Sequence, residues 1–148
     1  MRRISSTSSF NVQSFKQWAN ITTTTEDAMI TRLINSAITK VEDVSNVSLA
    51  ANVLEVISKG ERHDLYLLPI SVINSVKDRE TGVDVDYTIS ADKGYIITPD
   101  REVIVNYTTT ATDDYELTQI VYEYALALYD GQDEELKRIL NKINKPIC

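Results

Sequence analysis

The sequence TTEDAMITRLINSAITKVEDVSN spans residues 24–46 and carries the longest uninterrupted helical period of the chain. Its apolar residues recur at steps of three and four and therefore share one helix face. They are Ile30, Leu33, Ile34, Ala37, Ile38, Val41 and Val44. Thr24 can cap the first turn, where Glu26 and Asp27 complement the helix dipole. We predict a helix over residues 25–45 whose wide apolar face indicates a core or a subunit interface.

A second strong helical period follows Asp113 and Asp114, and it predicts a helix over residues 114–129. Its apolar face consists of Leu117, Ile120, Val121, Tyr124, Ala125 and Leu128. Weaker periods predict short helices over residues 12–19, after the capping residue Asn11, and over residues 134–143.

The part between the two long helices favours strands. Residues 83–90 alternate strictly, with Val83, Val85, Tyr87 and Ile89 on one face. Turn signals stand at residues 58–61, 80–82, 92–94 and 99–100, so we predict short strands between residues 47 and 107.

The resulting fold class is α+β: two long amphipathic helices plus short N- and C-terminal helices packed with a small antiparallel hairpin-rich sheet. We expect residues 1–10 to be a flexible N-terminal arm and residues 11–148 to form a single domain, because 148 residues suit one domain.

Composition narrows the function classes. The net charge is −7, from 22 acidic against 15 basic residues, which is unsuited to wrapping nucleic acid. It suits solubility, or a surface past which DNA slides without sticking. The single cysteine, Cys148, excludes an internal disulfide or a cysteine-based zinc site. We find no transmembrane run and no signal peptide, and we predict no membrane partner.

The sequence gives only weak signals for catalytic or metal-binding residues. His63 is the only histidine, lies in the turn-rich sequence GERHD, and is predicted to be a surface loop residue. Asp84 and Asp86 share a strand face but lack the rest of a calcium loop. Acidic clusters at residues 113–114 and 133–135 are explained as helix starts. We therefore predict no enzyme activity, no catalytic residues, no metal and no cofactor.

Tyrosines crowd the second long helix. Tyr115, Tyr122 and Tyr129 recur every seven residues, whereas Tyr124 lies with the apolar stripe. The seven-residue series forms a second flank, which we call the tyrosine flank. Tyrosine is favoured at protein–protein interfaces, but packing on two sides within one subunit explains the flank equally well.

Two basic regions can contact a partner. Arg2 and Arg3 can meet DNA phosphates or an acidic protein, or can simply be solvated, because two charges give little affinity. The basic residues between 137 and 145 complement the negative end of the last helix, which already explains most of their placement.

The order of segments resembles the head–tail connector (adaptor) proteins of tailed bacteriophages. Residues 27–37 match the D-A-x-I-x-x-L-I-x-x-A helix of that family, which follows a short helix and a polar turn. Further pieces follow in the family's order: Leu68-Pro69 with a valine-rich segment, Val85-Asp86-Tyr87, Val103-x-Val105-x-Tyr107 and Ala125-x-x-Leu128-Tyr129. The usual Gly-Arg after the first long helix is replaced by Ser45-Asn46-Val47.

The resemblance implies a structural virion protein made in the host cytoplasm: a ring, commonly of twelve copies, at the head–tail junction. Such a ring binds the portal protein, prolongs the channel for genomic DNA without sequence-specific binding, and receives the next tail or adaptor protein. Alternatives are a tail-completion or other capsid-associated protein, or an unrelated small oligomeric binding module.

Within the connector hypothesis, residues on the two long helices are subunit-interface candidates: Ile30, Leu33, Ala37, Tyr115, Tyr122 and Tyr129. The family's use of its C-terminal portion toward the portal makes five residues portal-side candidates: Glu134, Lys137, Arg138, Lys142 and Lys145. Arg2 and Arg3 are candidates for contacts made by the arm.

Overall fold

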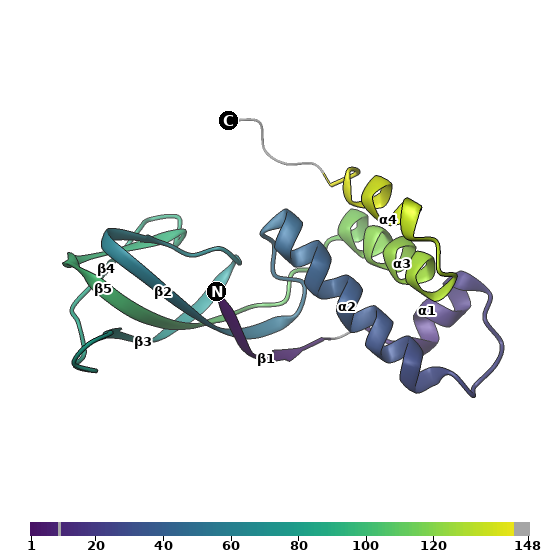
Figure 1. The fold of residues 1–148 in the computed structure, drawn as a ribbon, viewed down its shortest axis with the longest axis horizontal. Helices are drawn as coiled ribbons and strands as arrows, with labels where there is room; N and C mark the ends of the chain where they lie inside the picture. Colours follow the sequence, from purple (N-terminus) through teal and green to yellow (C-terminus); the bar gives the residue numbers. More distant parts are fainter. Residues whose placement is uncertain (9, 144–148) are drawn as a thin grey trace. The chain divides into compact units, whose positions relative to one another are not determined.

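The computed structural model describes residues 1–8 and 10–143, and the chain divides into two compact units. Unit 1 comprises Met1–Thr7 and Asn46–Thr112, and unit 2 comprises Ser8–Ser45 and Asp113–Cys148. Unit 1 contains the strands and unit 2 the helices (Figure 1). The chain passes three times between the two units. The single domain expected over residues 11–148 stays a prediction.

Unit 1 is a five-stranded antiparallel sheet with the order β1-β2-β5-β3, in which β4 pairs only with β5. The strands are β1 (Arg2–Thr7), β2 (Ala51–Asp64), β3 (Ile70–Asp78), β4 (Thr88–Ile89) and β5 (Tyr95–Thr109). The long strands β2 and β5 run side by side and form the centre of the sheet (Figure 1).

Alternation along β2 and β5 builds the core of unit 1. Leu54 and Val56 of β2 share the buried face with Val103, Val105 and Tyr107 of β5. Tyr107 is fully buried, and its hydroxyl accepts a hydrogen bond from the Leu67 backbone N–H at 3.4 Å. The opposite face keeps Ile57 partly exposed, as expected of an antiparallel sheet with one solvated side.

A coordinated bend crosses β2 and β5 where the sequence predicts two turns. Gly60 pairs with Arg101 but Arg62 pairs with Ile97, so the register shifts between them. Gly60 adopts φ +113°, which favours glycine. The turn signals at residues 58–61 and 99–100 lie opposite one another, and each strand continues through its own signal. They mark the bend of one long ribbon, and predicting two turns there was wrong.

The expected fold class is also wrong. The helices hold 8, 19, 15 and 8 residues, whereas β2 and β5 alone hold 14 and 15. Helix and strand contribute about equally, so two long helices do not dominate and the sheet is not small. Residues 83–90 supply only β4 and a bridge at Asp84. Of their alternating apolar residues, Val85 is buried in the core of unit 1, whereas Val83, Tyr87 and Ile89 are exposed.

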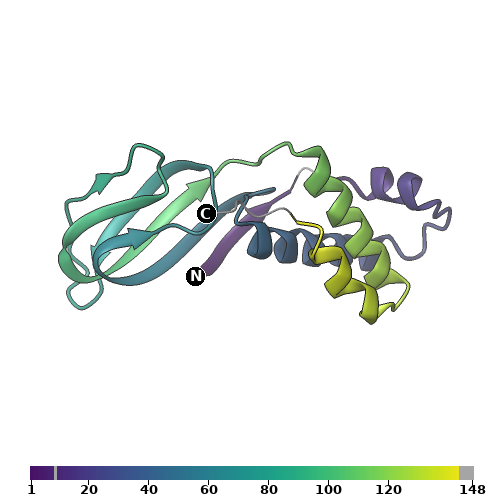
Figure 2. The same ribbon diagram turned by 90° about the horizontal axis from the view of Figure 1, so that it is seen from above.

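Unit 2 consists of α1 (Val12–Ala19), α2 (Asp27–Ser45), α3 (Tyr115–Tyr129) and α4 (Asp133–Leu140). Helix α3 contacts the other three, and α3 and α4 lie side by side (Figure 2). The Asn11 side chain caps α1, as predicted, and the Asp114 side chain caps α3 by accepting from the Leu117 N–H at 3.0 Å. Helix α2 starts at Asp27, because the Thr23 hydroxyl oxygen accepts from the Thr25 N–H at 3.3 Å.

The first residues belong to the sheet. The expected arm at residues 1–10 contains β1, which pairs with β2 through partners such as Arg2↔Glu55 and Thr7↔Ala51. A register shift between Arg3 and Ser5 leaves Ile4 at a bulge, 47% exposed. The polar residues of β1 form an edge strand because the long neighbour β2 offers its backbone groups.

Candidate functional site

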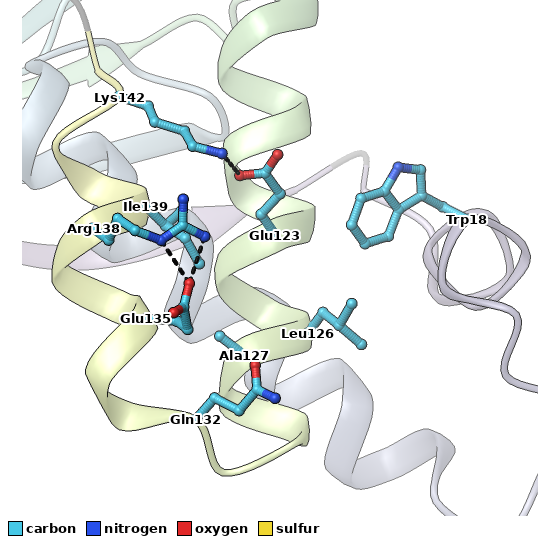
Figure 3. Close-up of a pocket in the computed structure, with 9 residues that line it drawn as sticks. All are labelled: Trp18, Glu123, Leu126, Ala127, Gln132, Glu135, Arg138, Ile139 and Lys142. Carbon is cyan, nitrogen blue, oxygen red and sulfur yellow. Dashed lines mark hydrogen bonds and ion pairs between the residues drawn. The ribbon is translucent and has the colours of Figure 1, made fainter.

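A groove of about 220 Å³ lies in unit 2 between α1, α3 and α4. Its floor is apolar, from Leu126 and Ala127 of α3 and Ile139 of α4, and Trp18 of α1 forms the opposite wall (Figure 3). Helical spacing explains this arrangement, because Ile139 is the buried residue of α4 and faces α3. The complete lining is Trp18, Glu123, Leu126, Ala127, Gln132, Glu135, Arg138, Ile139 and Lys142.

Two ion pairs form the rim of this groove. Lys142 Nζ donates to Glu123 Oε2 at 2.8 Å, and the Arg138 guanidinium contacts the Glu135 carboxylate one helical turn away (Figure 3). Each carboxylate is matched by a cation, so the rim carries both signs without a net charge. A partly exposed polar ligand group can therefore find either a donor or an acceptor there.

Four rings pack together beside the groove. Tyr122 of α3 contacts Phe15 and Trp18, with ring centroids 5.7 and 5.6 Å away, and these two rings stack on each other at 6.3 Å. Phe10 packs edge-on against Tyr122 at 6.0 Å. Trp18 Nε1 donates to Gln119 Oε1 at 3.1 Å and keeps the indole 38% exposed. We call Phe10, Phe15, Trp18 and Tyr122 the aromatic cluster. Such ring pairs stabilise packing beyond area burial alone.

The tyrosine flank divides into three different environments. Tyr122 belongs to the aromatic cluster, and Tyr129 Oη donates to Glu26 Oε2 at 2.5 Å. That hydrogen bond to a carboxylate raises the pKa of the Tyr129 phenol above its ordinary value. Tyr115, at the first turn of α3, is 77% exposed. Only Tyr115 therefore has the accessibility of a free contact residue among the three.

The interface candidates on α2 lie inward. Ile30 and Ala37 are fully buried and Leu33 is half-buried, on the face of α2 that packs within the helical unit. Their periodicity reflects the core of unit 2.

The portal-side candidates lie on or just after α4. Glu134 and Lys137 are exposed, and Arg138 and Lys142 take part in the rim ion pairs. Lys145 lies outside the described residues. Of the two arm candidates, Arg2 pairs with Glu55 at 3.1 Å on the sheet, and Arg3 is half-buried.

His63 differs from its prediction as a surface loop residue. It lies in β2 and is fully buried, with Nδ1 2.8 Å from Ser58 Oγ and Nε2 2.8 Å from Thr98 Oγ1. Burial lowers the pKa of the imidazole, against the opposing effects of the Gly60 carbonyl and the Asp64 carboxylate. The sequence missed this because the neighbouring glycine and charges suggested a turn where β2 bends.

Within residues 1–8 and 10–143, no group of three or more His, Cys, Asp or Glu side chains is placed to hold a metal ion. None of the helices that the structure describes is long and apolar enough to cross a membrane.

The groove was not found from the sequence. Trp18 and residues 123–142 are separated by more than 100 positions, and a single tryptophan with ordinary helix faces gives no local signal of a shared wall. The exposed indole of the only tryptophan becomes informative once α1 is placed against α3.

Comparison with protein families matches residues 9–137 to the head completion protein (HCP) family. This chain belongs to that family. It is accordingly a structural virion protein of the head–tail connector class.

Three solved structures have similar folds. A chain in the neck of an empty gene transfer agent (GTA) particle, computed with C6 symmetry, has a TM-score of 0.71 at 15% identity over 94% of this chain and 91% of that chain. A chain in the virion of a native GTA particle has a TM-score of 0.70 at 13% identity over 99% of this chain and 96% of that chain. A chain in the neck of a native GTA particle, computed with C12 symmetry, has a TM-score of 0.63 at 12% identity over 100% of this chain and 97% of that chain. Comparison with curated protein sequences finds no match.

Proposed function

We propose that this chain forms a ring of twelve copies that docks below the portal, prolongs the DNA channel and receives the next tail component. The observation that carries the proposal is the family match, which extends over residues 9–137 and so includes both units. The chain contributes shape and contact surfaces to the particle, and we propose that it needs no catalytic group for this role.

Symmetry supports the ring. The similar folds come from particle necks computed with C6 and C12 symmetry. A closed ring requires heterologous contacts, in which two unlike surfaces of each subunit meet. Unit 2 offers such a pair, because Tyr115 at the start of α3 and the groove near its end are different surfaces of one helical unit.

Charge supports a channel function. The net charge of −7 disfavours adhesion of DNA phosphates to the ring, which permits passage of the genome. We therefore propose that genomic DNA passes through the channel without sequence-specific binding.

The portal contact is proposed for α4 and the residues after it. Lys137 is the best single candidate because it is exposed and extends from the same helix as Glu134. Arg2 and Arg3 remain proposed contact residues at the sheet edge, where Arg2 is exposed beside Glu55.

The proposal is tested by purifying the full chain with portal rings and imaging the complex by electron microscopy. We expect a second ring on one face of the portal. A chain that never co-purifies with portal rings, at any salt concentration, would contradict the proposal. Removing residues 134–148 should abolish this binding, and Lys137→Glu should weaken it while leaving the buried Ile139 in place.

A further inference from the structure

We propose that Tyr115 of one subunit inserts its ring into the groove between α1, α3 and α4 of the next subunit. This inference rests on the proposed ring and names the two side-chain surfaces that close it. It assigns separate roles to the three members of the tyrosine flank: Tyr122 and Tyr129 hold unit 2 together, and Tyr115 makes the contact between copies.

The exposure of Tyr115 makes it the candidate for the contact with the next copy. Its side chain is 77% exposed, the highest value among the large hydrophobic side chains of the described residues. It stands in the first turn of α3, where Asp114 fixes the backbone by capping. A rigid ring on an anchored helix start loses little conformational entropy when it is bound, which is one reason tyrosine is frequent among residues that dominate binding.

The groove matches a tyrosine in size. Its volume is about 220 Å³. An apolar cavity of about 150 Å³ is known to hold a benzene ring, so a phenol ring with its Cβ fits the larger groove. The floor of Leu126, Ala127 and Ile139 provides apolar contacts, and Trp18 provides an aromatic wall.

The groove also matches a tyrosine in chemistry. A buried phenol needs a hydrogen-bond partner for its hydroxyl, and the rim supplies both kinds. The Glu123 carboxylate can accept from the phenol, and Lys142 can donate to it (Figure 3). An aliphatic anchor would leave this polar rim unused, so the groove favours a ring that carries a hydroxyl.

The proposed occupant of the groove is Tyr115 of a second copy, because the proposed ring joins identical copies through two unlike surfaces. Tyr115 and Leu126 are about 17 Å apart along α3 at 1.5 Å per residue, so one copy cannot fill its own groove. Repeating the contact links each copy to the next in the same sense, as a ring requires. The line from Tyr115 to the groove must then run roughly perpendicular to the ring axis.

The first test uses the full chain mixed with portal rings. We expect Tyr115→Ala to raise the concentration needed for ring assembly by about tenfold or more, as for a residue that dominates an interface. Tyr66→Ala is the matched control, because Tyr66 is also exposed, at 53%, but lies in unit 1. Gln132→Trp should fill the groove and block assembly; Gln132 is exposed and its side chain does not cap α4.

Trp18 reports on the groove directly. As the only tryptophan, it should shift its fluorescence to shorter wavelength when the wild-type chain assembles, because the partner ring covers the indole. Rings that form from Tyr115→Ala with wild-type affinity and the same Trp18 shift would overturn the inference and leave the proposed ring intact. A wild-type chain that forms no ring on the portal would overturn the proposed function and the inference with it.

Disulfide trapping tests the pairing of the two surfaces in a Cys148→Ser background. A chain with both Tyr115→Cys and Gln132→Cys should give a ladder of covalent oligomers on oxidation in the assembled ring, and Tyr66→Cys with Gln132→Cys should give none. The single Tyr115→Cys and Gln132→Cys variants should link only when mixed. Self-linking of either variant alone, or no ladder from the double variant at a concentration where its rings are seen to assemble, would overturn the inference.

Discussion

The two units bury different kinds of polar side chain. In unit 1 the buried polar residues are neutral: Ser48, Asn52, His63, Thr98 and Thr109. In unit 2 they are charged, namely Lys16, whose Nζ donates to Asp27 Oδ1 at 2.8 Å, and Glu42.

The difference follows from how each backbone is satisfied. Helices pair their own N–H and C=O groups, so unit 2 needs few short polar side chains inside. The sheet has irregular places, and the neutral residues gather there. Ser58, His63 and Thr98 flank the bend of β2 and β5, and Ser48 Oγ lies 2.6 Å from Thr109 Oγ1 where β5 ends. Unit 1 thus places buried neutral side chains where its backbone is irregular, whereas the helices of unit 2 satisfy their own backbone groups.

The largest expected effect is on the core of unit 1. Tyr107→Ala removes a fully buried ring from β5 and should cost about 3–5 kcal/mol of unfolding free energy. Hydrogen exchange measured by mass spectrometry should show faster exchange in β2 and β5 than in α3. Equal loss of protection in both units would contradict the separation drawn between them.

Tyr107→Phe is the control for that variant. It keeps the ring and removes only the hydroxyl that accepts from Leu67 N–H at 3.4 Å. A hydrogen bond of this length is weak, so the loss should be at most about 1 kcal/mol. Burial raises the pKa of the Tyr107 phenol, which agrees with a neutral ring serving the core.

The contrast between units also explains what could be predicted from the sequence. Helical periodicity depends on local spacing, and the helices are observed at Asp27–Ser45 and Tyr115–Tyr129, close to the predicted ranges. Strand length depends on partners far along the chain. Gly60 and Pro99-Asp100 have the local chemistry of turns, and only their opposition across β2 and β5 makes them a bend.

The candidate site shows the same limit. The seven-residue spacing predicts Tyr115 as a member of the tyrosine flank. It does not predict that the environment of Tyr115 differs from those of Tyr122 and Tyr129. That separation comes from Phe10 and Phe15, which approach Tyr122, and from Glu26, which accepts from Tyr129. These contacts join distant parts of the chain, so no local sequence pattern predicts them.

A pH effect should be confined to unit 1 and centred on His63. Burial lowers the pKa of His63 in the folded state below its ordinary value of 6.5. The unfolded chain then binds a proton that the folded chain excludes, so unfolding is favoured as pH falls below about 6.5. The slope of unfolding free energy from this group is at most about 1.4 kcal/mol per pH unit. Urea unfolding at pH 7, 6 and 5 measures it.

Two variants separate this effect from carboxylate titration. His63→Gln should flatten the slope between pH 7 and 5. Asp92→Asn should leave that slope unchanged, because hydrogen bonds from the Ser90 hydroxyl and Gly94 N–H lower the pKa of Asp92, away from the range between pH 7 and 5. A slope that persists in His63→Gln would show that the buried imidazole does not cause the pH dependence of the unfolding free energy.

The smallest expected effect concerns the start of α3, which carries Tyr115. Asp114→Ala removes the side-chain oxygen that accepts from Leu117 N–H and should cost about 1 kcal/mol. Asp114→Asn keeps an acceptor and loses only the charge near the positive helix end, so it should cost a few tenths of a kcal/mol at low salt. Hydrogen exchange in the first turn of α3 measures both changes. Since helix packing, and not the cap, holds unit 2 together, the sheet should keep its protection in both variants. If Asp114→Ala instead exposes β2 and β5 as strongly as α3, the two units unfold as one, and their different interiors have no separate stability.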